Sequence, residues 1–307
     1  MRGVVGAGLG SSDTNCSEER RCVRMTRGVL GVSIALLLWP QGGWAGQDLS
    51  LEEVLERATA HVMVLGNDLS TVVMDERTEQ TYDSGREDGV EQRELRSEFL
   101  LVRVQDLYSW KGFRDVFEVD GVEVHDGRDR IQEIFLAGAE ALPRLQTIVE
   151  ESARHNLGPT TRTLNEPTYA LFFLHDTHRR RFRWAKSNEA CQTDPTAWAI
   201  AYEEVQYPTL TRGLEGASLP ASGRFCIDPT SGAVLGSELS VRHESPAGNP
   251  LVEADVAVSF TYDEGVGTWV PSQMRETYLE AGGHRTVSVA TYSNYRRFGT
   301  KARLLPQ

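Results

Sequence analysis

Four consecutive residues, His175, Asp176, Thr177 and His178, are the first whose types and spacing could do chemistry. Two imidazoles three positions apart, with a carboxylate between them, can ligate zinc. A zinc site needs a further ligand at suitable spacing, and none is evident, while the following Arg179–Arg181 disfavours a bound cation. We therefore predict no metal site and interpret this segment as an exposed connection between a helix and a strand.

The arginine run, extended by Arg183, could itself bind an anionic headgroup or a phosphate through charge-assisted hydrogen bonds. The other interpretation is a charged loop that is simply solvated. The solvated loop is favoured, and the anion site remains the alternative.

A second candidate cluster is Glu150, Glu151 and His155, where Glu151 and His155 share one helical face. A carboxylate and an imidazole placed together could do general acid and base work. Such spacing is frequent on exposed helices, and the chain has no Gly-x-Ser-x-Gly elbow, no His-Glu-x-x-His and no glycine-rich phosphate loop. We predict no catalytic residue and no cofactor, so the protein is expected not to be an enzyme.

The amino terminus has the pattern of an export signal. Met25 begins a segment with a short positive region at Arg27, an apolar run over residues 29–38 and a small-residue cleavage site after Ala45. We therefore predict that residues 1–45 are a signal peptide with a mistaken amino-terminal extension. A twin-arginine signal at Arg20-Arg21 is the alternative.

The charge of the mature chain limits its partners. Removing residues 1–45 takes away five arginines and three acidic residues, which leaves 27 basic and 41 acidic groups and a net charge of −14, against −12 for the whole chain. An acidic secreted protein is not expected to bind nucleic acid or an anionic membrane face by general attraction. Transient contact with a membrane is the alternative that this charge balance leaves.

Cys191 and Cys226 are the cysteines that follow the predicted cleavage site. In an oxidising compartment they predict one disulfide, which would stabilise the fold by about 3 kcal/mol in the chain-entropy model. Two free buried thiols are the alternative. The predicted location is therefore the periplasm or the exterior of the cell.

Element patterns extend over one domain, residues 46–307. Ser50 and Glu53 form a capping box before an amphipathic helix that Gly66 should end. Strands are expected within 68–82 and 95–104, and Phe113–Val124 predicts a hairpin that turns at Asp120-Gly121. A helical insertion is expected over residues 127–175, followed by a long antiparallel series of strands.

This order of elements resembles the LolA/LolB-like superfamily, carriers of outer-membrane lipoproteins. The closing segment Ala290–Phe298 is similar to the endings of secreted proteins of this general type. The resemblance implies an α+β fold, in which a strongly curved antiparallel sheet forms an open, unclosed barrel and helices cover its concave face.

A carrier of this type needs an apolar concave surface and a movable cover. The candidate lining residues are the apolar members of alternating strands: Phe99, Leu101, Phe117, Val119, Trp198, Ile200, Tyr202, Leu239, Val241, Val256, Val258, Phe260, Val287 and Val289. The candidate cover residues are Ile131, Phe135, Leu145, Leu171, Phe172, Phe173 and Leu174. The alternative for every one of these residues is a filled core, because cores and cavities use the same residue types.

The leading functional prediction is a non-enzymatic secreted protein that binds a lipid, a lipoprotein acyl chain or another hydrophobic small molecule between sheet and helices. A second hypothesis is a protein-interaction or sensory domain for envelope stress, with another envelope protein as its partner. The third is a hydrolase that uses His155 or His175. The sequence predicts no particular oligomeric state.

Overall fold

The computed structural model describes residues 49–86, 89–104, 109–124, 130, 141–158, 162, 164–213, 216–244, 250–280 and 282–297. The chain divides into residues 1–47 and residues 48–307, and the following description concerns the second unit. The predicted signal peptide lies outside the described residues, as do Ile131 and Phe135. Within the described ranges, no helix is long and apolar enough to cross a membrane.

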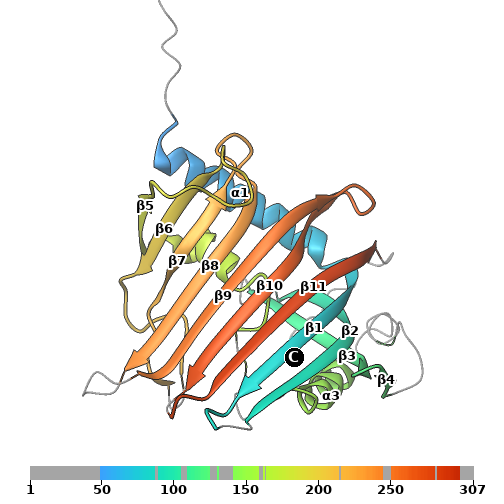
Figure 1. Ribbon diagram of the computed structural model, residues 1–307. Helices are drawn as coiled ribbons and strands as arrows, with labels where there is room; N and C mark the ends of the chain where they lie inside the picture. Colours follow the sequence, from blue (N-terminus) through green and yellow to red (C-terminus); the bar gives the residue numbers. More distant parts are fainter. Residues whose placement is uncertain are drawn as a thin grey trace, which may run out of the picture. The chain divides into compact units, whose positions relative to one another are not determined.

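Within the described residues, eleven strands form a single antiparallel sheet in the order β4-β3-β2-β1-β11-β10-β9-β8-β7-β6-β5 (Figure 1). The outer strands β4 and β5 are not neighbours in this order, so the described sheet is open, as the sequence predicted. The strands are β1 (Val72–Asp83), β2 (Val90–Val104), β3 (Ser109–Val119), β4 (Val122–Glu123), β5 (Phe182–Lys186), β6 (Trp198–Glu204), β7 (Ala221–Ile227), β8 (Val234–Glu244), β9 (Pro250–Asp263), β10 (Thr268–Glu280) and β11 (Arg285–Arg297).

The sheet has two wings that meet where β1 pairs with β11. The first wing is β1 to β4, and the second is β5 to β11. The predicted hairpin closes the first wing, with Asp120 at φ 49° and Gly121 at φ 80°, the positive values that a tight two-residue turn requires. Its second strand is shorter than predicted, because Val122 and Glu123 are exposed and no packing extends the pairing.

Helix α1 (Leu51–Leu69) begins at the predicted capping box, where the Ser50 hydroxyl accepts from the Glu53 N–H and Glu53 Oε2 accepts from the Ser50 N–H. The prediction that Gly66 ends this helix is wrong. Gly66 lies on the buried face, and Leu69, one turn further along, is fully buried, so packing continues the helix beyond the glycine.

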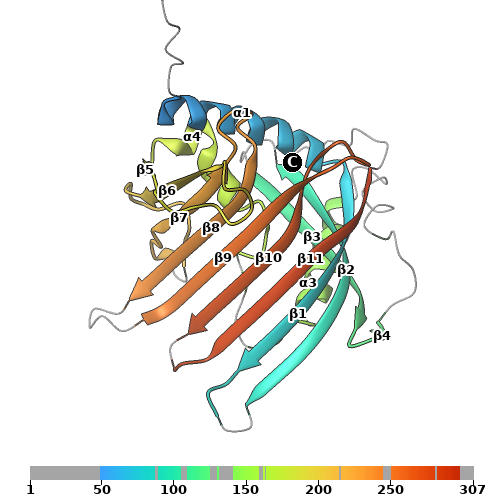
Figure 2. The same cartoon turned by 45° about the horizontal axis from the view of Figure 1, so that its top comes forward.

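Among the described residues, the part of the chain between the wings forms α3 (Ala141–Ala153), the 3₁₀ helix η2 (Ala170–Leu174) and the single-turn helix α4 (Asp176–Arg179). Helix α1 crosses both wings, with contacts to β2, β8 and β10, and it also contacts η2. Helix α3 instead packs against β3, and Figure 2 shows α1 and α3 at separate parts of the sheet. Near the end of the predicted helical insertion the chain forms η2, in the tighter 3₁₀ form.

The largest cluster of buried apolar side chains, called the apolar core below, joins α1 and η2 to the sheet. Its members are Val54, Leu55, Ala58, Val62, Leu65, Leu69, Val72, Met74, Phe99, Leu101, Leu164, Ala170, Leu171, Phe173, Leu174, Phe182, Ile200, Tyr202, Leu219, Ala221, Phe225, Ile227, Val234, Leu239, Val241, Ala254, Val256, Val258, Phe260, Val266, Val270, Met274, Tyr278, Ala290 and Tyr292. The Thr59 hydroxyl donates to the Leu174 carbonyl at 2.7 Å and so joins α1 to η2.

The predicted disulfide is present between Cys191 and Cys226, with a Cα separation of 5.7 Å. It links the connection between β5 and β6 to strand β7. The cross-link therefore lies in the second wing, beside a small cluster that contains Ala199 and Leu235.

Candidate functional site

Nine predicted lining residues lie together in the apolar core: Phe99, Leu101, Ile200, Tyr202, Leu239, Val241, Val256, Val258 and Phe260. Trp198 packs against the core from a partly buried position. Of the predicted cover residues, Leu171, Phe173 and Leu174 are in the core, and Phe172 packs against it.

The cover and the sheet pack directly on one another in this region. The Phe173 ring lies 4.8 Å from that of Phe182 and 5.6 Å from that of Tyr202, and Phe225 lies 5.0 Å from Tyr202, all measured between ring centroids. Phe173 and Phe225 are fully buried. This is the arrangement of the filled-core alternative.

The other predicted lining residues lie elsewhere. Val287 and Val289 are partly exposed, whereas their neighbours Thr286, Ser288 and Ala290 are buried, so the two valines lie on the opposite face of β11. Phe117 is buried and Val119 is partly exposed, next to an irregularity in the pairing of β2 with β3. Leu145 belongs to α3, and only its backbone is described.

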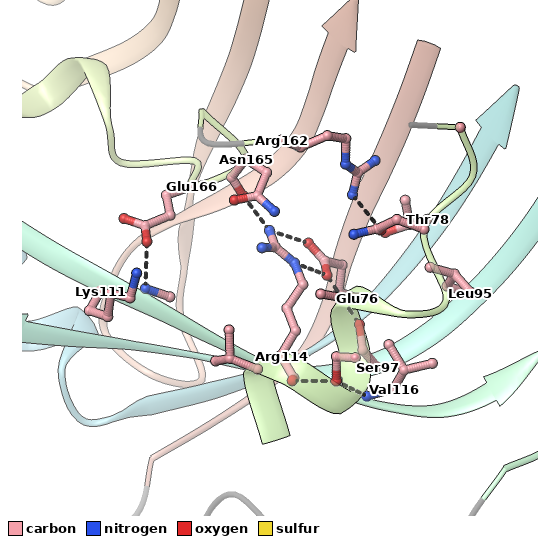
Figure 3. Close-up of a pocket in the computed structure, with 16 residues that line it drawn as sticks. Glu76, Thr78, Leu95, Ser97, Lys111, Arg114, Val116, Arg162, Asn165 and Glu166 are labelled. Carbon is pink, nitrogen blue, oxygen red and sulfur yellow. Dashed lines mark hydrogen bonds and ion pairs between the residues drawn. The ribbon is translucent and has the colours of Figure 1, made fainter. Parts of the chain in front are cut away.

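A cavity of about 510 Å³ lies beneath α3 on the first wing (Figure 3). Strands β1 to β3, helix α3 and the chain that follows α3 all contribute to its walls. The lining residues are Glu76, Thr78, Leu95, Ser97, Lys111, Gly112, Arg114, Val116, Val149, Ser152, Ala153, Asn156, Gly158, Arg162, Asn165 and Glu166. Most of them are polar or charged, in contrast to the apolar lining that the sequence predicted.

A buried ion pair between Arg114 of β3 and Glu76 of β1 forms one side of the cavity. Arg114 Nε donates to Glu76 Oε2 at 2.6 Å and Nη2 donates to Oε1 at 3.1 Å, while the Glu76 side chain is only 1% exposed. Arg114 Nη2 also donates to the Asn165 carbonyl at 2.5 Å, and its guanidinium carbon lies 4.4 Å from the centre of the Phe99 ring. Arg114 therefore ties the segment after α3 to the sheet.

Arg162 lies at another side of the same cavity, and its side chain is 5% exposed. Its Nη2 donates to Asn156 Oδ1 at 3.1 Å, and Asn156 Oδ1 also accepts from Gln80 Nε2 at 3.0 Å. The nearest carboxylate contact runs from Arg162 Nε to Glu276 Oε2 and measures 4.0 Å, which is too long for a hydrogen bond. Nε and Nη1 have no hydrogen-bond partner among the described residues.

Glu166 and Gly112 meet at a third side of the cavity. Glu166 Oε1 accepts from the Gly112 N–H at 3.0 Å, and burial raises the pKa of the Glu166 carboxyl. A Cβ on residue 112 would lie 2.8 Å from the Phe99 ring, so glycine is what allows the strand, this ring and Glu166 to approach closely. Lys111 lies beside them and is exposed.

Some of the polar residues of the cavity, including Glu76 and Thr78, come from inward-facing strand positions. Along β1 the buried alternation runs Val72, Met74, Glu76, Thr78 and Gln80, so it changes from apolar to polar halfway along the strand. Strand β11 continues this polar region, because Ser288 lies opposite Gln80 in the register. This run of polar residues at every second position of β1 is the sequence pattern that could have indicated the cavity. An apolar alternation is the usual sign of a buried strand face, so the polar run does not stand out.

The clusters that first suggested chemistry lie away from this cavity or have other partners. The His175 imidazole accepts from the Thr177 N–H and caps α4, while His178 packs against Phe172, and burial lowers the pKa of His178 to about 4. Among the described residues, no group of three or more His, Cys, Asp or Glu is placed to hold a metal ion.

Of the predicted acid and imidazole pair, Glu151 lies in α3, whereas His155 follows the end of this helix at Ala153. Glu151 pairs with Arg130 at 2.6 Å, and the His155 carbonyl accepts from Arg93 Nη1 at 2.8 Å. Glu150 lies on the same helix and is exposed.

Searches of protein-family models and of curated proteins found no match to this chain. Three solved structures that match it are similar in fold over most of their length. A domain assigned to outer-membrane lipoprotein sorting, from Vibrio parahaemolyticus, is 11% identical with a TM-score of 0.38, and the match covers 81% of this chain and 93% of that one. A LolA superfamily protein from Nitrosomonas europaea is 9% identical with a TM-score of 0.31, covering 84% and 96%.

A DUF1329 family protein from Desulfovibrio piger is 9% identical with a TM-score of 0.32, and the match covers 81% of this chain and 94% of that one. These values describe a remote likeness of fold, whereas the open antiparallel sheet is established by the strand order of this chain itself. The chain thus has an open antiparallel sheet with a polar cavity beneath α3.

Proposed function

We propose that this protein is a non-enzymatic binding protein of the periplasm or the cell exterior. Its ligand is an amphiphile, a lipid or the acylated end of a lipoprotein, held between the concave face of the sheet and α3. The supporting observation is the cavity of about 510 Å³, a volume typical of small-molecule sites.

The cavity wall combines two kinds of surface. Leu95, Val116 and Val149 supply apolar contact, and Arg114 and Arg162 supply hydrogen-bond donors. Burial of an acyl chain contributes roughly 25 cal/mol per Å² of apolar area, and the polar groups orient the other end of the ligand. A ligand with one apolar and one polar end therefore suits this wall better than a bare hydrocarbon.

Helix α3 is held to β3 by hydrogen bonds that a movement of the cover would break. The Ser152 hydroxyl accepts from the Val116 N–H at 3.2 Å and donates to the Arg114 carbonyl at 2.8 Å. Water can replace both bonds when the cover moves, so opening carries a modest net cost. We expect the ligand to enter by displacement of α3.

Two matched substitutions test the proposal. Val149→Trp places a large ring in the cavity, whereas Val64→Trp adds the same ring to a valine of α1 that is 61% exposed. Binding of pyrene-labelled phosphatidylglycerol is followed by fluorescence. We expect Val149→Trp to weaken binding about tenfold or more, equivalent to about 1.4 kcal/mol, and Val64→Trp to leave it unchanged.

Native mass spectrometry of the protein purified from its source supplies an independent readout. Co-purified lipid, lost in Val149→Trp, supports the proposal. A stoichiometric protein partner that survives delipidation, together with no binding of the labelled lipid, would contradict it and favour a protein-interaction domain.

A further inference from the structure

Arg162 is the buried group of the cavity whose hydrogen bonds are least complete. We propose that Arg162 forms a headgroup subsite and that the ligand carries an anionic oxygen group, a phosphate or a carboxylate. This inference rests on the proposed function and specifies the polar end of the amphiphile.

The first support is the state of the guanidinium itself. The Arg162 side chain is 5% exposed and lines the cavity, yet Nε and Nη1 have no hydrogen-bond partner among the described residues. Buried polar groups are normally satisfied, and the exceptions call for a missing partner. A planar guanidinium with two unused donors matches the oxygens of a phosphate or carboxylate.

Further polar atoms without partners lie on the neighbouring strands. The buried hydroxyls of Thr286 and Ser288 and the Oε2 atom of Glu276 lack hydrogen-bond partners among the described residues. Glu276 and Ser288 are directly opposite each other in the pairing of β10 with β11, and Glu276 is the carboxylate nearest to Arg162. The hydroxyls can rotate to donate, so they add to the capacity of this region to bind oxygen atoms or ordered water.

The charged groups around the cavity leave the two unused donors of Arg162 available to an anion. Its lining includes the cations Lys111, Arg114 and Arg162 and the carboxylates Glu76 and Glu166, in a chain whose net charge is −12. Glu76 is engaged by Arg114, and Glu166 Oε1 accepts from the Gly112 N–H, so both carboxylates already have partners. The Glu276 carboxylate lies 4.0 Å from Arg162 Nε and compensates part of the positive charge. At this distance it does not accept a hydrogen bond from Nε.

The arginine run that first suggested an anion site has its own carboxylate partners. Arg179 pairs with Glu52 at 2.8 Å, Arg181 with Glu204 at 3.3 Å, and Arg183 with Glu203 at 3.0 Å. Three of the four arginines of this run therefore already face a carboxylate, and none of the four lines the cavity. The anion site is therefore assigned to Arg162.

The test compares two ligands that differ only in the headgroup. Dihexanoyl phosphatidic acid and dihexanoyl glycerol carry the same chains, and inorganic phosphate supplies the anion alone; binding of each is measured by titration calorimetry. We expect phosphatidic acid to bind the wild type about tenfold more tightly than the neutral lipid. Arg162→Gln should remove this preference. Arg162→Lys keeps the positive charge but loses the paired donors of the planar guanidinium, so it should retain part of the preference.

Arg183→Gln is the matched control, because Arg183 is 71% exposed and lies outside this cavity. It should leave both affinities unchanged. Equal binding of the two lipids by the wild type, or a preference that survives in Arg162→Gln, overturns the headgroup assignment and leaves the proposed function standing. The comparison of the two lipids on the wild type tests the assignment even where a variant does not fold.

Inorganic phosphate separates the two sources of the anion. Weak phosphate binding beside tight binding of phosphatidic acid identifies a lipid headgroup. Phosphate binding that needs Arg162, without binding of either lipid, keeps the anion site but overturns the proposed lipid function. Absence of binding by all three ligands overturns both.

Discussion

The two halves of the concave face share one sheet but are built differently. Beneath η2 and α1, aromatic and aliphatic side chains such as Phe173, Tyr202 and Phe225 pack with ring centroids 5.0 to 5.6 Å apart. Beneath α3, the inward positions carry Glu76 and Arg114, and a cavity of about 510 Å³ remains. We call the region beneath η2 and α1, which is a filled apolar core, the packed half. We call the region beneath α3, where charged and polar side chains line a cavity, the polar half.

The difference follows from what each side chain needs. Apolar groups gain free energy by excluding water and filling space, so they close on one another. Buried charges need partners of fixed geometry, which restricts the side chains that can surround them. We infer that the packed half supplies most of the stability, while the polar half is free to serve binding.

The largest expected effect is on the packed half. Phe173→Ala removes a fully buried ring of η2 from the apolar core and should cost about 4 kcal/mol in the free energy of unfolding, measured by urea denaturation. Phe172→Ala, at a partly buried neighbour, is the matched control and should cost clearly less. Equal and small losses for both would contradict the assignment of a filled core.

In the polar half, the second-largest loss of stability is expected when the ion pair between Arg114 and Glu76 is broken. Arg114→Met leaves the buried Glu76 carboxylate without its cation and should cost about 3 kcal/mol, towards the lower end for a broken buried pair because the Arg114 side chain is 18% exposed. Adding Glu76→Leu to make the double variant should recover part of this loss. A double variant as unstable as the sum of the single variants would show that the two groups do not act as a pair.

Much of the fold could be predicted from sequence, because its signals are local. The capping box at Ser50, the turn at Asp120-Gly121 and the alternation through Tyr202 each depend on residues a few positions apart. The disulfide between Cys191 and Cys226 followed from the compartment and from the small number of candidates.

The cavity could not be predicted in the same way, since its charges meet only through register. Glu76 and Arg114 come from strands separated by β2, and Arg162 comes from a segment without a regular period. Their identities suit exposed strand or loop positions equally well. Only the pairing of β1 with β2 and β11, and the return of the chain after α3, brings them under one cover.

The smallest expected effect concerns pH and again separates the two halves. His61 of α1 lies against Trp269 in the packed half, with ring centroids 6.2 Å apart, and burial lowers its pKa to about 4 from a usual 6.5. The folded protein therefore binds this proton less readily than the unfolded chain, so the stabilising contribution is complete above pH 6.5 and is lost as the pH falls towards 4.

At pH 5 this loss should reach about 2 kcal/mol relative to pH 7, since each pH unit in the window between the two pKa values is worth about 1.4 kcal/mol. Urea denaturation of the wild type and of His61→Gln at both pH values isolates the contribution of the imidazole from that of the carboxylates. Burial raises the pKa of Glu166 in the polar half, so its contribution has the opposite sign and falls as the pH rises. A pH dependence that is the same in wild type and His61→Gln would place the acid sensitivity outside the packed half and remove this distinction between the two regions.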